Sequence, residues 1–347
     1  MKPIKAAELL IEKIKRDYTD DISLLVIMGS TIYNDTHERS DLDMFFVPKT
    51  KRGFNLGFTF IIDGIGYDFW ALSWERLERI ASHEERIVSI ITEGQLLYCA
   101  TDEDREHWDR LKAKALDVSD RPHLLSKAGE QLDSACIDLV SLINARGLPE
   151  TRYHAIGLIY KLGQAIALLN GVSIKRGRGK LLNEILAMPL VPQHFKELYN
   201  TAFYSNDKNE IISSFAALIE ITHKYIKDER ILHTQPRSFK NNWSQQYEEM
   251  INAYNKIAHA CEINDPVTAL FASVELVHEI EEATKYTGIE LNSLPDLVSG
   301  YDPKDLSKIA EHAKAHQAAL EKLLEEQCVS IMRFEDFNEL EKHLAAL

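Results

Sequence analysis

The chain of 347 residues is long enough for two domains with sizeable cores. Its 45% hydrophobic and 27% charged residues are typical of a soluble globular protein. Its formal net charge of −14 disfavours nucleic acid as the main partner. An acidic surface of this kind suits a small cationic substrate, or no charged partner at all.

The cysteines and the N-terminus indicate where the protein works. The four cysteines have no paired spacing, which predicts reduced thiols: Cys99, Cys136, Cys261 and Cys328. Met1-Lys2-Pro3 leads directly into an amphipathic helix rather than a signal peptide, and no apolar run reaches membrane-spanning length. We therefore expect a cytoplasmic protein without a membrane partner.

Helical and strand patterns alternate through the first third of the chain. The expected elements are a helix over 4–17, strands over 24–28 and 42–47, a hairpin of 54–62 and 65–72 around Asp63-Gly64, a helix over 74–84 capped by Ser73, a strand over 94–99 and a helix over 102–115. This alternation predicts an α/β (α+β) sheet domain over residues 1–117.

After Asp120-Arg121-Pro122 the pattern is helical to the end of the chain. Long amphipathic periods cover 131–145, 152–169 and 209–227, and the segments 239–260 and 267–287 have the spacing of an antiparallel pair. These features predict a larger all-α domain over residues 121–347, either one helical bundle or a bundle in two parts. We expect this domain to shape the pocket of an acceptor substrate.

The strongest chemical signal lies between residues 24 and 47. Gly29-Ser30 ends an apolar strand, and Asp41 and Asp43 follow about ten residues later at the start of the next one. Strand alternation puts both carboxylates on one face, with Leu42 turned into the core. Adjacent aspartates repel each other, whereas a pair of Mg²⁺ ions needs such oxygen ligands. The Gly-Ser turn can present N–H groups and a hydroxyl to a triphosphate. This stretch therefore predicts phosphoryl chemistry.

The pattern of a hydrophobic residue, Gly29-Ser30, a gap of about ten residues and then Asp41-Leu42-Asp43 resembles the nucleotidyltransferase superfamily of DNA polymerase beta. It is most similar to the small-molecule branch typified by aminoglycoside nucleotidyltransferases. That family has a third carboxylate on a later strand, and Asp68, within Gly66-Tyr67-Asp68-Phe69-Trp70, lies where it is expected. The resemblance covers the first third of the chain.

The resemblance implies an enzyme that transfers a nucleoside monophosphate, AMP from ATP, to a hydroxyl of a small molecule and releases pyrophosphate. Asp41 and Asp43 would bridge two Mg²⁺ ions, and Asp68 would help to hold one of them. Gly29 and Ser30 would contact the nucleotide phosphates. An aminoglycoside-like antibiotic is the expected acceptor on the resemblance alone.

Several assignments stay open at this level. Arg39 either neutralises triphosphate charge or is a solvated loop arginine. The general base is Asp68 or a glutamate of the helical region such as Glu130 or Glu184. Two other functions fit the same pattern: an adenylylating antitoxin that acts on a protein or tRNA, and a catalytically inactive nucleotide-binding module. No pattern fixes the oligomeric state.

Two further patterns have both a functional and a structural interpretation. Residues 175–180 form the one dense basic cluster of an acidic chain, which is either a phosphate contact or a charged loop between helices. His312 and His316 have the spacing of a zinc site, but their Ala-rich, charged surroundings favour a solvated surface pair. We expect the acceptor to bind between the two predicted domains, facing the three aspartates.

Overall fold

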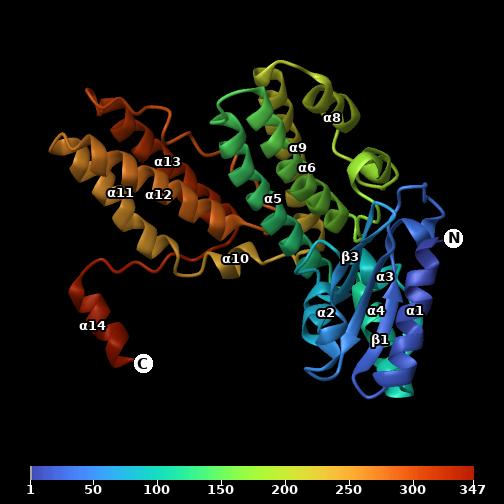
Figure 1. Cartoon of the computed structure of the whole chain (residues 1–347). Helices are drawn as coiled ribbons and strands as arrows, with labels where there is room; N and C mark the ends of the chain where they lie inside the picture. Colours follow the sequence, from blue (N-terminus) through green and yellow to red (C-terminus); the bar gives the residue numbers. More distant parts are fainter. Residues whose placement is uncertain (1) are drawn as a thin grey trace. The chain divides into compact units, whose positions relative to one another are not determined.

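The computed structural model describes residues 2–347 and contains two compact units, one ending at His233 and one running from Thr234 to Leu347 (Figure 1). The first unit begins with a small mixed sheet, and the rest of the chain is helical. This confirms the predicted fold class, a sheet domain followed by a larger helical region. The helical region that follows the sheet and its covering helices begins at Arg121, and its helices up to His233 belong to the same compact unit as the sheet.

Five strands form the sheet in the order β3-β4-β2-β1-β5. Their bounds are β1 Ile22–Ile27, β2 Asp43–Pro48, β3 Thr59–Ile62, β4 Ile65–Ala71 and β5 Gln95–Cys99. Strands β2 and β4 pair in parallel, and the other neighbours pair antiparallel. Asp63 and Gly64, with φ of +52° and +77°, form the predicted turn between β3 and β4.

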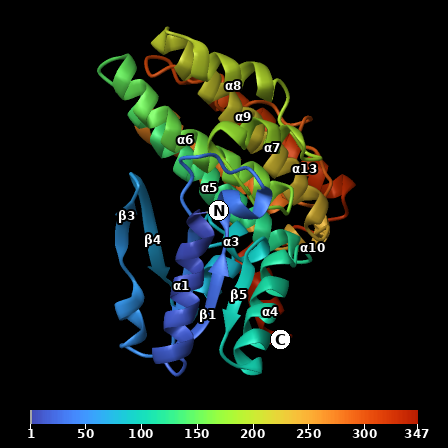
Figure 2. The ribbon, with the colours of Figure 1, turned by 45° about the vertical axis from the view of Figure 1, so that its right-hand side comes forward.

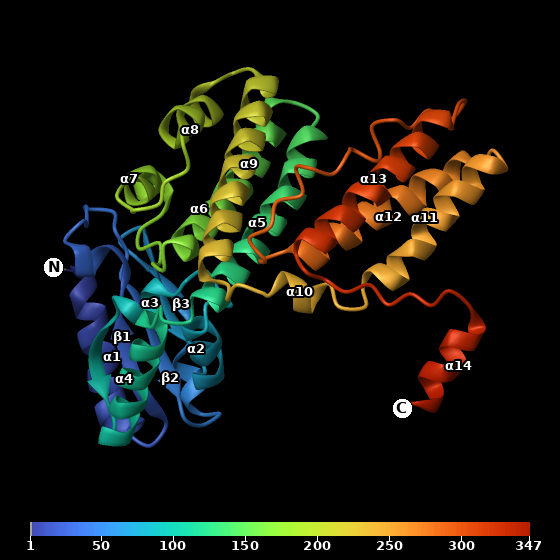
Figure 3. The same cartoon turned by 180° about the vertical axis from the view of Figure 1, so that it is seen from behind.

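Helices cover both faces of the sheet (Figures 2 and 3). Leu42, Met44 and Phe46 point to the face covered by α1 Lys2–Asp17. Phe45 lies in the core of the opposite face, because neighbouring residues of a strand point in opposite directions. That face is covered by the helices that follow β4: α2 Trp74–Ala81, α3 Ser89–Thr92 and α4 Asp102–Leu116.

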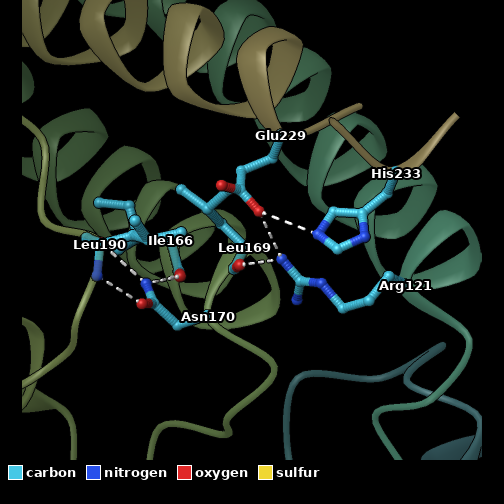
Figure 4. A network of polar contacts seen from close by, with 7 residues as sticks. All are labelled: Arg121, Ile166, Leu169, Asn170, Leu190, Glu229 and His233. Carbon is cyan, nitrogen blue, oxygen red and sulfur yellow. Dashed lines mark hydrogen bonds and ion pairs between the residues drawn. The ribbon is translucent and has the colours of Figure 1, made fainter. Parts of the chain in front are cut away.

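The remaining helices of the first unit share a core of their own. Their bounds are α5 Arg121–Ile143, α6 Leu148–Leu169, α7 Leu181–Leu186, α8 Phe195–Tyr204 and α9 Lys208–His233. A polar network at the end of α6 fixes three of these segments (Figure 4). Arg121 donates to the Leu169 carbonyl at 2.8 Å and pairs with Glu229 at 3.2 Å, which ties the start of α5 to α6 and to the end of α9.

The second unit has a separate core built around Trp243, Tyr247 and Leu276. Its helices are α10 Phe239–Asn242, α11 Tyr247–Glu262, α12 Pro266–Thr284, α13 Ser307–Glu326 and α14 Phe337–Ala345. The α11 and α12 helices pack together, close to the predicted pair. None of the helices within residues 2–347 is long and apolar enough to cross a membrane.

The histidine pair of the second unit differs from its predicted exposure. His316 is buried and its Nδ1 lies 2.6 Å from the Tyr254 hydroxyl, whereas His312 Nδ1 lies 3.0 Å from the Asp296 carbonyl. The prediction of a solvated pair was therefore wrong for His316. Each ring has a protein partner of its own.

Candidate functional site

The Gly29-Ser30 turn and Asp43 form one continuous surface. The chain leaves β1 at Ile27, the Met28 N–H donates to the Asp43 carbonyl at 2.9 Å, and a short 3-10 helix, η1 Gly29–Tyr33, follows. Gly29 has φ of +70°, and a Cβ at this position would overlap the Asp43 carboxylate. Glycine is therefore required both by the left-handed backbone and by the close approach to Asp43.

The sheet places the predicted carboxylate of Asp68 beside that of Asp43. Asp43 is paired in register with Asp68 on the parallel strand β4, and strand neighbours in register point to the same face. Asp41 lies two residues before Asp43, just outside the strand, and is exposed. Leu42 between them is buried, as the alternation predicted.

Asp43 has an unusual electrostatic environment. Partial burial raises the pKa of the Asp43 carboxyl, and the charge of Asp41 raises it further. The charge of Arg178, the Ser30 backbone N–H and the charge of Arg176 act in the opposite direction. Asp43 is thus repelled by the carboxylate of Asp41 and attracted by the guanidinium groups of Arg178 and Arg176.

The fit of these residues to a metal ion is partial. Carboxylate oxygens are the ligands that Mg²⁺ prefers, and the repulsion between Asp41 and Asp43 is what a divalent cation relieves. Within residues 2–347, however, no group of three or more His, Cys, Asp or Glu side chains is gathered as a metal site. Asp41 and Asp43 therefore fit a cation as a pair, and Asp68 lies beside Asp43 on the neighbouring strand β4.

Arg39 lies apart from this constellation. Its side chain is exposed and makes no hydrogen bond or ion pair with the rest of residues 2–347. Its backbone N–H donates to His37 Nδ1 at 3.1 Å, and the His37 N–H donates to Ser40 Oγ at 2.9 Å. This local network shapes the loop before Asp41.

The basic cluster, residues 175–180, lies against the Gly-Ser turn. Arg176 Nη2 and Lys180 Nζ pair with Asp35 at 2.8 and 3.3 Å, and the Asp35 N–H donates to the Ser30 carbonyl at 3.2 Å. The Arg176 guanidinium also lies over the Tyr33 ring, 5.0 Å from its centroid. The cluster thus brings cations from the helical part of the chain to the strand that carries Asp43.

The structure also constrains the candidate general bases. Glu184 accepts the backbone N–H groups of Lys175, Arg176 and Gly177 at 2.7, 2.9 and 2.8 Å, so its carboxylate is committed to the loop. Glu130 pairs with Lys127 at 2.9 Å. Asp68 is the remaining candidate on the face that carries Asp43.

Comparisons with known proteins give little beyond this geometry. No family model and no curated protein matches the sequence. Among solved structures, a nucleotidyltransferase-like protein from Exiguobacterium sibiricum 255-15 is similar over 64% of this chain and 76% of that chain, with 9% sequence identity and a TM-score of 0.39. A likeness of this size carries no argument, so the functional proposal rests on the residues of this chain.

Proposed function

We propose that the protein is a nucleotidyltransferase that moves a nucleoside monophosphate, AMP from ATP, to a hydroxyl of a small molecule and releases pyrophosphate. The observation that carries this proposal is the contact between Gly29 and Asp43. It joins a turn with N–H donors to a strand with acidic side chains, which is the combination that a nucleoside triphosphate with divalent cations needs.

The residues of this chain divide the work in the following way. Ser30 and its turn bind the triphosphate oxygens, and Asp41 and Asp43 would hold Mg²⁺ together with Asp68. When bound, the two ions would neutralise the phosphates and lower the pKa of the acceptor hydroxyl. Asp68 would take the hydroxyl proton, an assignment supported by its exposure and by the face that it shares with Asp43. Arg39, an exposed side chain of the loop before Asp41, would add positive charge that neutralises the triphosphate.

The acceptor is the least constrained part of the proposal. The net charge of −14 favours a cationic acceptor, and an aminoglycoside-like antibiotic has both the charge and the hydroxyl groups. The same chemistry on a protein or tRNA would define an antitoxin, and the absence of any transfer would define a nucleotide-binding module. A screen separates these three functions.

The test is release of pyrophosphate from ATP and Mg²⁺ in the presence of aminoglycosides, lincosamides and common metabolites, followed by mass spectrometry of the modified acceptor. We expect Asp43→Asn to lower kcat by at least about 100-fold, because it removes charge stabilisation at the reacting phosphate. Asp109→Asn, which changes an exposed aspartate of α4, should leave kcat unchanged.

Binding gives an independent readout of the same site. Mg²⁺ added with a nucleotide should raise the melting temperature above the value with nucleotide alone, through binding linkage. Asp43→Asn should remove this metal-dependent increment. A full increment in Asp43→Asn would show that this strand is not the metal site.

A further inference from the structure

A closed loop carries the basic cluster. Asn170, just after α6, accepts the Leu190 N–H at 2.7 Å and donates to the Leu190 carbonyl at 2.8 Å (Figure 4). Its amide also donates to the Ile166 carbonyl at 2.8 Å, which anchors the pair to the helix. The segment 171–189 therefore leaves and returns at one fixed point, and contacts inside the loop add to those that it makes with Asp35 and Glu93.

The main internal contact is made by Glu184 on α7. Its two carboxylate oxygens accept three successive backbone N–H groups, those of residues 175–177. Successive N–H groups that converge in this way form an anion-binding nest. Here the anion is a side chain of the same loop, so the nest holds the backbone in place rather than a ligand.

The nest holds a strained backbone. Gly177 and Arg178 both have positive φ, +58° and +46°. A positive φ is uncommon for a residue other than glycine, asparagine or aspartate, and it persists only where surrounding contacts enforce it. Strain of this kind is concentrated at binding and active sites.

The contacts of the cluster leave one arginine without an ion pair among residues 2–347. Asp35 neutralises Arg176 and Lys180, and Lys175 Nζ pairs with Glu93 at 3.0 Å. The Arg178 side chain, in contrast, is exposed and makes no hydrogen bond or ion pair with the rest of residues 2–347, although its charge acts on Asp43. These ion pairs hold the cluster in place, and the Arg178 guanidinium remains available to bind an anion.

We propose that this loop is a polyphosphate-binding element, in which Arg178 contacts the phosphate chain and Glu184 is the positioning residue that holds Arg178 in its strained conformation. The proposal rests on the proposed function, since the phosphate chain is that of the nucleotide bound at the Gly29-Ser30 turn. A guanidinium suits this ligand because its planar donors bind two phosphate oxygens at once.

The loop also permits a purely structural explanation, in which Glu184 only stabilises α7. The two explanations predict opposite changes in the anion affinity of the Glu184→Gln variant. Glu184→Gln removes a negative charge, so electrostatics alone would strengthen the binding of an anion. If Glu184 positions Arg178, the same substitution weakens that binding.

The experiment is calorimetric titration of the full-length protein with inorganic tripolyphosphate at low ionic strength, without metal or acceptor. We expect Arg178→Ala to raise the dissociation constant by about tenfold or more, the usual range for a lost charge-assisted hydrogen bond. Arg178→Lys should recover part of the loss. The matched control is Arg152→Ala, which removes an exposed arginine of α6 that donates to Asn206 Oδ1 at 2.8 Å and makes no hydrogen bond or ion pair with the basic cluster, residues 175–180. This control should bind like the wild type.

Glu184→Gln should weaken binding several-fold, and the double variant Glu184→Gln, Arg178→Ala should bind no more weakly than Arg178→Ala alone, because the two residues act through one contact. Tighter binding by Glu184→Gln, or additive losses in the double variant, would overturn its positioning role. Unchanged binding by Arg178→Ala, or no binding by the wild type, would overturn the site. Absence of nucleotidyl transfer with tripolyphosphate binding intact would overturn the proposed function and not this site.

Discussion

At the scale of single residues, Gly29 allows the most direct test of the candidate site. Gly29→Ala introduces a left-handed alanine, which costs roughly 1–2 kcal/mol, and a Cβ that overlaps the Asp43 carboxylate. We expect urea denaturation to show a larger loss of unfolding free energy than the backbone cost alone, together with a loss of transfer activity because Asp43 must move.

Gly64 is the matched control for this substitution. It also has a left-handed backbone, with φ of +77°, but a Cβ there would meet no atom within 4 Å. Gly64→Ala should therefore lose similar stability and keep its activity. Equal activity losses in both variants would mean that Gly29 contributes only through backbone strain.

His83 provides a second prediction at this scale, which concerns stability against pH. Its ring is buried, and neither ring nitrogen makes a hydrogen bond of good geometry within residues 2–347. Burial lowers the pKa of His83 below the ordinary value of 6.5, and the neighbouring His123 lowers it further, while the Ala115 carbonyl acts against the shift. The unfolded chain therefore takes up a proton before the folded protein does.

The sign follows from this order of protonation. Stability linked to His83 is fully present above about pH 6.5 and is lost as the pH falls below it, with a slope of at most about 1.4 kcal/mol per pH unit for one proton. His83→Asn, which tolerates the left-handed φ of +60°, should reduce the difference in unfolding free energy between pH 7.5 and 5.5. The exposed His223 is the control, and an equal reduction in His223→Asn would contradict the assignment.

At the scale of elements, local signals predicted the sheet. The apolar runs of β1 and β2, the turn at Asp63-Gly64 and the Ser73 cap, whose hydroxyl accepts the Arg76 N–H at 3.2 Å, all lie close to their predicted positions. Each depends on residues near in sequence. The in-register pairing of Asp43 with Asp68 depends instead on a long-range parallel contact, which strand periodicity does not determine.

The helical region shows the limit of the same method. The dense charge of residues 175–180 left a phosphate contact and a charged loop between helices both open. The partners Asp35 and Glu184 could not be predicted because they lie on other elements. His316 left a signal that periodicity could have found. It shares the helical spacing of the buried Ile309, Ala313 and Leu320, so it belongs to the core stripe of α13.

At the scale of the whole molecule, the boundary between the two compact units, His233 and Thr234, indicates which part of the chain can be deleted without loss of the phosphate site. The hydrophobic cores of the two units share no residue. Arg121, Glu229 and His233 form a connected polar network, which links the start of α5 to the last residue of the first unit. Every residue assigned to the site or to the basic cluster lies before this point.

A chain ending at Gln235 should therefore fold and bind tripolyphosphate with the dissociation constant of the full-length protein. A chain ending at Asp120 should lose this binding even if its sheet forms, because it lacks Arg178 and the loop that holds it. Circular dichroism and thermal unfolding establish whether each fragment folds, and calorimetry compares the affinities. If the chain ending at Gln235 folds and binds at least tenfold more weakly, the second unit contributes to the phosphate site and the division proposed here is wrong. If it binds normally but fails to modify an acceptor that the full-length protein modifies, the acceptor depends on residues after His233, because the phosphate-binding part would then be intact.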